Sequence, residues 1–134
     1  MLILPKAAQD QILAHARSGL PNEACGLLAG LAQGDEKTVL GVYCLKNLDQ
    51  SPEHFSMAPE DQFKAIQEIR KKGWALLGNF HSHPSTPSRP SNEDIRLAFD
   101  PSLSYVIVSL ATAEPVLKSF LISKGLAAEE AIGQ

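Results

Sequence analysis

The most constraining stretch of the sequence is residues 78–94, where two histidines run directly into a proline-rich segment. An apolar run, residues 74–77, leads toward His81 and His83. In a β-strand, residues i and i+2 point to the same face, about 7 Å apart along the backbone. The seven residues after His83 contain Pro84, Pro87 and Pro90. Because prolines restrict the unfolded chain, such a loop costs less to order. The pattern predicts a strand that presents two imidazoles and ends in a braced loop.

The length and composition favour one globular domain, residues 1–134. A chain of 134 residues is long enough to bury a core without disulfides or structural metals. Its composition, with 44% hydrophobic and 20% charged residues, is ordinary for such a domain. The net charge of -3 gives no reason to expect nucleic acid or an anionic membrane as partner. No apolar run approaches the roughly 20 residues that span a bilayer, and the first residues lack the features of a signal peptide. The expected location is therefore the cytoplasm.

The pattern of apolar residues predicts alternating helices and strands. Helices are expected at residues 5–17, 59–72 and 91–99. Strands are expected at residues 2–4, 24–30, 38–45, 54–57, 74–80, 104–110 and 115–123. Residues 127–134 are expected as a short helix or a frayed tail. Gly26 and Gly30, inside the second strand, indicate close backbone approach. The order predicts an α/β (α+β) domain with a mixed sheet and helices packed on it.

The two cysteines do not form a disulfide framework. A tight turn at Gly34 and Asp35 would place Cys25 and Cys44 opposite each other on a hairpin. Reducing cytosol argues against a bridge, so both are expected as buried thiols that act as small hydrophobes.

Asp94 turns the histidine pair into a candidate metal site. An H-x-H pattern alone is weak, because many unrelated metal sites and plain strands contain one. Two histidines with a carboxylate form one of the ligand sets of catalytic zinc, with a fourth position left for water. The same set describes non-haem iron sites. Residues 91–94 can equally be an N-cap serine with acidic residues in the first helical turn, and both interpretations can hold together.

Glu23 is the candidate base. Metal-assisted hydrolysis needs a group that takes a proton from water. Glu23 stands where a turn enters a buried, glycine-containing strand, and burying a carboxylate without a purpose is costly. The alternative is an ordinary turn residue at the surface.

Taken together, these positions resemble a known family. Glu23, His81-x-His83-Pro84 and Ser91-x-x-Asp94 match the pattern of the JAMM (MPN+) metallopeptidases. The resemblance covers most of the chain, and the chain is similar to the small, stand-alone prokaryotic members of the family. It extends to residues 2–5, 21–30, 54–57 and 105–110. Ala58 departs from the aspartate expected there, which affects a helix cap and leaves the site intact.

The resemblance implies a zinc hydrolase that cleaves the peptide or isopeptide bond after the C-terminal Gly-Gly of a ubiquitin-like protein. It also implies a curved mixed sheet flanked by helices, similar to the cytidine deaminase architecture. By position, His81, His83 and Asp94 would bind Zn²⁺, Glu23 would be the general base, and Ser91 would hydrogen-bond the oxyanion.

The resemblance also narrows the substrate. The chain lacks the insertions with which larger relatives hold ubiquitin, which favours a small sulfur-carrier protein of ubiquitin-like fold. Asn79, Phe80 and residues 85–89 are expected to border the cleft for the Gly-Gly tail. Alternatives are an isopeptidase acting on ubiquitin itself and a non-catalytic scaffold of the same fold. Scaffold members look degenerate at the ligand positions, whereas all five positions are present here.

Overall fold

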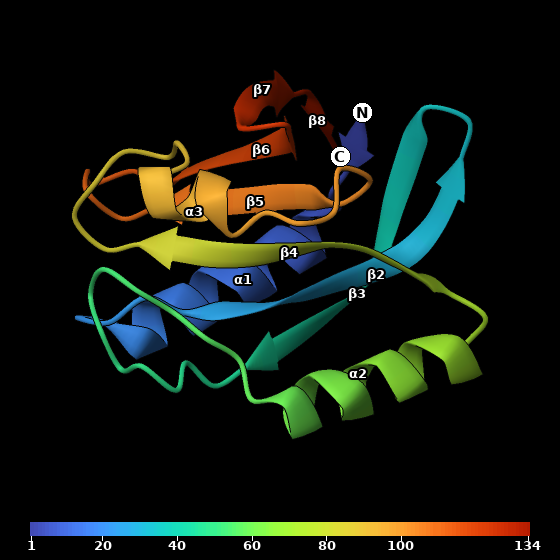
Figure 1. The fold of residues 1–134 in the computed structure, drawn as a ribbon, viewed down its shortest axis with the longest axis horizontal. Coiled ribbons are helices and arrows are strands. Elements are labelled where there is room, and N and C mark those ends of the chain that lie inside the picture. Colours follow the sequence, from blue (N-terminus) through green and yellow to red (C-terminus); the bar gives the residue numbers. More distant parts are fainter.

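One eight-stranded mixed sheet runs through the whole chain in the computed structural model, which describes residues 1–134 (Figure 1). The strand order is β7-β6-β5-β4-β2-β3-β1-β8. The strands are β1 (Leu2–Ile3), β2 (Cys25–Gln33), β3 (Glu36–Leu45), β4 (Ala75–His83), β5 (Ser104–Ser109), β6 (Val116–Ser123), β7 (Leu126–Glu130) and β8 (Ile132–Gly133). The helices are α1 (Lys6–Gly19), α2 (Pro59–Lys71) and α3 (Asn92–Arg96). The predicted mixed sheet with packed helices is confirmed. None of the helices has the length and apolar character needed to cross a bilayer.

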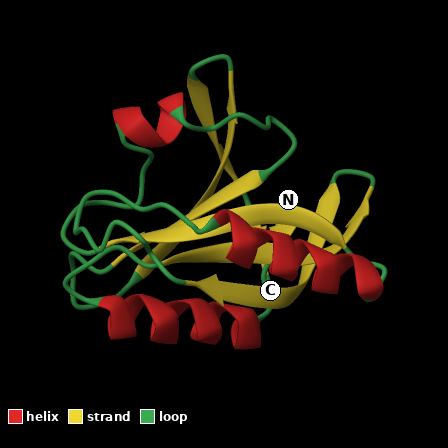
Figure 2. Cartoon of the chain, turned by 60° about the horizontal axis from the view of Figure 1, so that its bottom comes forward, coloured by secondary structure: helices red, strands yellow, loops and turns green.

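The main core lies between α1 and one face of the sheet. Ala8, Ile12 and Ala16 recur at helical spacing and are buried, so α1 presents one apolar stripe. This stripe belongs to the same buried cluster as Phe80 of β4 and Val106 of β5. Because side chains alternate along a strand, the neighbours of Phe80 in β4 point to the opposite face. Figure 2 shows the short helix α3 on that opposite side, with the sheet between it and α1.

Two glycines in β2 allow the close approach that the sequence indicated. A Cβ atom on Gly26 would collide with the Tyr43 carbonyl oxygen and with the ring of Phe80. A Cβ atom on Gly30 would collide with the Thr38 carbonyl. Larger residues at either position would push β3 away from β2.

Three predicted elements are wrong or too long. Residues 54–57 form no strand, because the Asn47 side chain takes over their backbone bonding: its amide donates to the His54 carbonyl and its oxygen accepts from the Ser56 N–H. Residues 126–133 form β7 and β8, which pair with β6 and β1, whereas a helix or tail was expected. The third helix ends at Arg96 instead of residue 99.

The cysteines differ from each other. Cys25 is buried, as predicted, and burial raises the pKa of its thiol to about 12. Cys44 is exposed, so the prediction of a second buried thiol is wrong. The β2–β3 register pairs Cys44 with Gly26 and Cys25 with Leu45, which offsets the two cysteines by one residue. Both are free thiols.

Candidate metal centre

The end of β4 brings His81 and His83 to the sheet face opposite α1. Both imidazoles are buried. β4 is paired on both sides here, since His81 lies opposite Cys25 of β2 and Ile107 of β5. The two histidines therefore lie on a strand that is hydrogen-bonded to a neighbouring strand on each side.

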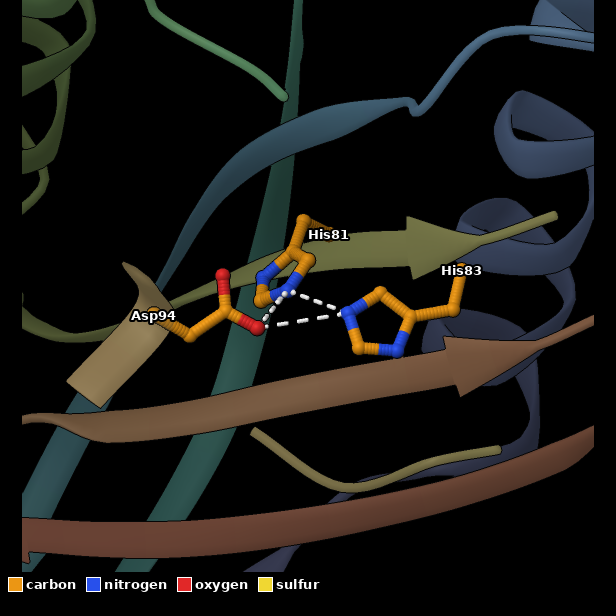
Figure 3. A group of neighbouring side chains, drawn as sticks. All are labelled: His81, His83 and Asp94. Atoms are coloured by element: carbon orange, nitrogen blue, oxygen red, sulfur yellow. Dashed lines mark hydrogen bonds and ion pairs between the residues drawn. The ribbon is translucent and has the colours of Figure 1, made fainter. Parts of the chain in front are cut away.

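Asp94 meets both imidazoles (Figure 3). Its Oδ2 atom lies 3.1 Å from His81 Nε2 and 3.3 Å from His83 Nε2, and the two Nε2 atoms are 3.1 Å apart. The structure therefore brings together all three predicted ligands, which come from β4 and from α3. Two imidazole nitrogens and one carboxylate oxygen that converge on a single point match the three-ligand set of a catalytic metal.

The orientation of His83 supports this interpretation. Its Nδ1 lies 2.8 Å from the carbonyl oxygen of Pro87, which can only accept, so Nδ1 carries the proton. The lone pair of Nε2 then points toward His81 and Asp94. A ligand histidine commonly has its other ring nitrogen held in this way. The residues present thus fit a divalent metal ion.

The proline-rich loop folds back as the sequence predicted. Besides the Pro87 carbonyl, the backbone of Thr86 is held, because Ser109 of β5 donates to its carbonyl at 2.6 Å. The Ser88 hydroxyl donates to the Val116 carbonyl of β6. These contacts tie the loop to the adjoining strands and return the chain to the histidines.

Ser91 and Asp94 form a capping box at the start of α3. The Asp94 N–H donates to Ser91 Oγ at 3.0 Å, and the Ser91 N–H donates to Asp94 Oδ2 at 2.9 Å. The interpretation as a helix cap and the interpretation as a ligand are therefore compatible. Because Ser91 Oγ accepts in this bond, its own proton remains available to a group in the open space above α3, where Ser91 is exposed.

Electrostatics keep Asp94 ionised. Burial alone would raise the pKa of Asp94, but its bonds with His81 and His83 hold that pKa well below the usual range. Burial alone would lower the pKa of His83, but its bonds with Asp94 and the Pro87 carbonyl outweigh burial and raise it.

Glu23 lies in the interior, which rules out the alternative of a surface turn residue. Its side chain is 6% exposed and Oε1 has no hydrogen-bond partner. Burial raises the pKa of Glu23 to about 7, against an opposing attraction from His83. Its backbone is fixed on both sides: the N–H donates to the Ser51 carbonyl, and the carbonyl accepts from Asn47. An unpartnered carboxyl group of this kind is suited to proton transfer.

Ser82, which was not predicted as a site residue, holds Glu23 in position. Ser82 lies between the two histidines and is fully buried. Its Oγ accepts from the Ala24 N–H at 2.8 Å, and its own N–H donates to the Ala24 carbonyl at 2.9 Å. These bonds extend the β2–β4 pairing by one residue, so that Glu23 comes beside His83. The feature of the sequence that could have indicated this role is the polar residue between the two histidines.

An apolar cavity of about 190 Å³ adjoins the centre on the side of His81. Asn79 lines it, as predicted for the cleft. Phe80 does not, because it points into the core on the α1 face. The lining also lacks residues 85–89, whose contacts brace the loop instead.

Phe55 lines this cavity, and neither Phe55 nor its neighbour His54 was predicted as a site residue. The Phe55 ring stacks on His81 with centroids 4.7 Å apart. His54 Nδ1 lies 2.8 Å from a carboxylate oxygen of Glu93 in α3. This contact joins the loop that carries Phe55 to the helix that carries Asp94.

Comparison with known proteins agrees with the geometry. A sequence model described as prokaryotic homologs of the JAB domain matches residues 5–123. The chain belongs to this family. The resemblance to the JAMM (MPN+) proteins is thereby confirmed.

Relatives of this JAB domain span nearly the whole chain. The CysO-cysteine peptidase of Mycobacterium tuberculosis is 30% identical, over 98% of this chain and 90% of the relative. The desampylase of Haloferax volcanii is 34% identical, over 81% of this chain and 80% of the relative. A Desulfitobacterium hafniense protein solved in solution has a TM-score of 0.91 and 62% identity, covering 98% of this chain and 91% of its own. A JAB1/MPN domain protein from Archaeoglobus fulgidus has a TM-score of 0.56 and 26% identity, covering 93% of each chain.

Proposed function

We propose that this JAB domain is a zinc-dependent peptidase that hydrolyses the peptide or isopeptide bond after the C-terminal Gly-Gly of a ubiquitin-like protein. The observation that carries the proposal is the buried, unpartnered carboxyl group of Glu23 beside three converging side chains that could bind a metal ion. The relatives' names support the reaction class: they include a CysO-cysteine peptidase, desampylases and a probable TtuB-protein conjugate cleaving protease.

The metal would be held by His81, His83 and Asp94. Zinc suits two imidazoles and one carboxylate, and when bound it lowers the pKa of a water molecule to about 7 and polarises a carbonyl group. Non-haem iron also accepts this set. Iron leaves Glu23 and Ser91 without a role, which favours zinc.

Glu23 would move the proton. Its carboxylate accepts a proton from water as the oxygen of that water adds to the scissile carbonyl carbon. The same proton then passes from Glu23 to the amide nitrogen as the C–N bond breaks, which leaves a carboxylic acid and an amine. The remaining proton of the acid is released to the amine or to solvent, so the acid product ends as a carboxylate. A pKa near 7 suits both steps, because the group can accept and release a proton near neutral pH.

Ser91 would stabilise the carbonyl oxygen. Its hydroxyl already accepts the Asp94 N–H, which fixes the Oγ position at the rim of the site. The hydroxyl proton is left to donate to the oxyanion that forms during addition. One donor of this kind is typically worth about 10²–10³-fold in turnover.

The substrate would be a small sulfur-carrier protein of ubiquitin-like fold, in the cytoplasm, with the whole chain acting as one domain. Of the alternatives, a non-catalytic scaffold has no use for a buried carboxyl group at the ligand cluster. An isopeptidase acting on ubiquitin itself remains the competing substrate hypothesis, and parallel assays with both substrates compare them.

The test uses a sulfur-carrier protein extended beyond Gly-Gly. Zinc-loaded parent protein should cleave it, and Glu23→Gln should lose roughly 10²–10⁴-fold in turnover while it retains zinc. Glu53→Gln, an exposed glutamate nearby, is the matched control and should cleave like the parent. If Glu23→Gln cleaves as well as the parent, Glu23 is not the base.

Metal analysis tests the zinc assignment separately. Protein purified without added metal should carry zinc, and His81→Ala or Asp94→Ala should lose it. Iron at one atom per chain would overturn the assignment.

A further inference from the structure

The centre has two different sides along β4. The side chains of Asn79, His81 and His83 follow one another along one face of the strand. Asn79 and His81 line the apolar cavity, whereas His83 and Glu23 do not. The register Cys25 opposite His81, continued through the two Ala24–Ser82 bonds, brings Glu23 to the His83 end. The cavity and the proton donor therefore lie on opposite sides of the ligand cluster.

This asymmetry sets the direction of the substrate. In the proposed reaction Glu23 gives its proton to the departing nitrogen, so the amine must leave on the side of His83. The acyl part of the substrate must then extend the other way, past His81 toward Asn79 and the cavity. An extended residue spans roughly 3.3–3.6 Å, so a few residues of tail reach beyond the centre.

The cavity is built for one apolar side chain. Its floor comes from Tyr105 and Ile107 of β5 and Ile122 of β6, and its walls from Phe55, Met57 and Leu97. Cavities of about 150 Å³ lined by similar residues hold a benzene molecule, so about 190 Å³ suits a side chain between leucine and phenylalanine in size.

Polar groups lie around this space as well. Asn79 is half-buried beside His81, where its amide can meet the backbone of an extended chain. The contact between His54 and Glu93 joins the wall that carries Phe55 and Met57 to α3. A mainly apolar pocket with a few polar groups is the usual form of a specificity site.

We propose that this cavity receives an apolar side chain of the carrier tail just before Gly-Gly, while the leaving amine lies on the opposite side, beside Glu23. The proposal rests on the proposed function and adds to it a sequence preference and a direction of binding. A charged residue at that tail position would enter an apolar site without a partner, which is unfavourable.

Matched substrates test the preference. Carriers with leucine or aspartate directly before Gly-Gly are compared, as are carriers with leucine or aspartate directly after it. The zinc-loaded parent should prefer leucine before Gly-Gly by roughly tenfold or more in kcat/KM, and should be indifferent to the residue after it. Leu97→Lys should reduce this preference to about threefold or less. Leu126→Lys, an exposed leucine on β7, is the control and should keep it.

A binding measurement gives a second readout. The chain has two methionines, Met57 in the cavity wall and Met1 just before β1. In the zinc-loaded protein labelled with ¹³C-methyl methionine, a short peptide ending in Leu-Gly-Gly should shift the Met57 signal and leave Met1 unchanged. The same peptide with aspartate in place of leucine should shift neither.

The outcomes separate two failures. If the parent and Leu126→Lys cleave no substrate, the proposed function is wrong and the tail site falls with it. If both cleave, but the preference is absent or follows the residue after Gly-Gly, the assignment of the cavity is wrong and the proposed function stands. If the leucine peptide does not shift the Met57 signal, the assignment of the cavity as the tail site is also wrong.

Discussion

The proposed metal ligands come from two elements that are held very differently. β4 lies inside the sheet, with β2 and β5 on either side, and buries Phe80 and Ser82 completely. α3 has five residues, none of them buried, and isolated helices shorter than about 12 residues are marginal in water. α3 depends on its capping box, on the loop before it and on the contact of Asp94 with the histidines. The fold alone therefore builds half of the centre, and local contacts build the other half.

Removal of the metal is the strongest test of this difference. The protein should lose cleavage and about 3–4 kcal/mol of stability, as expected when a ligand present at 100–1,000 times its Kd is withdrawn. Hydrogen exchange, compared with and without a chelator, should rise in residues 84–99 and stay slow in β4. An equal rise in β4 would mean that the metal holds the sheet as well as α3.

The next test concerns Ser91, which both caps α3 and is proposed to stabilise the oxyanion. Ser91→Ala should lower kcat about 10²–10³-fold with zinc retained. Ser91→Gly separates the two roles, because glycine caps a helix almost as well as serine but offers no hydroxyl. Both variants should be equally slow, as measured by steady-state kinetics alongside zinc content. Parent-like turnover of Ser91→Gly would leave Ser91 with a capping role alone.

The same contrast explains what the sequence could predict. The strand that carries His81 and His83 has a local pattern, and the spacing to Asp94 identified the returning loop. Glu23 was a candidate from its place at the entry to a glycine-containing strand and from the family pattern, but its backbone is held by Ser51, Asn47 and Ser82, which are distant in sequence.

The errors have a similar cause. β7 and β8 pair with β6 and β1, and the buried carboxylate of Glu130 accepts from Ser104 and Ser119. Residues 54–57 have the composition of a strand, but the Asn47 side chain bonds the His54 carbonyl and the Ser56 N–H. Long-range pairing decided these segments, and local periodicity does not report it.

Ser82 provides a smaller test of the same idea. Ser82→Ala leaves the buried Ala24 N–H without its acceptor, which should cost about 1–3 kcal/mol and reduce turnover through a misplaced Glu23. Ser119→Ala is the control, because it also removes a buried hydroxyl, but one that donates to Glu130 and lies on β6, two strands from β4. Chemical denaturation should find both variants weakened, and kinetics should find only Ser82→Ala slow. Ser82→Thr, which keeps the hydroxyl, should restore turnover. Equal loss of turnover in Ser82→Ala and Ser119→Ala would assign Ser82 a general structural role.

The smallest predicted effect is the loss of folding stability that the ionised Glu23 carboxylate causes in the metal-free protein. Its pKa rises from 4.5 to about 7 on folding, so the folded state binds the proton more tightly than the unfolded state. The stability from this proton is fully present below pH 4.5 and is lost as the pH rises through 7. Between pH 5 and pH 8 the parent should therefore lose about 1–2 kcal/mol relative to Glu23→Gln, which is less than the full pKa shift implies because solvent screening reduces it.

Urea denaturation of both metal-free proteins at these two pH values measures the difference, with Glu53→Gln as the control. A parallel pH dependence in parent and Glu23→Gln would mean that Glu23 is solvated and poorly suited to the proton transfer proposed for it. The other outcome is a pH dependence of stability that differs between the parent and Glu23→Gln without metal, and differs less when zinc is restored. That result would mean that Glu23 is poorly solvated and suited to the proposed proton transfer. The cation would then offset the cost of the buried carboxylate, as it also completes the contacts that α3 lacks on its own.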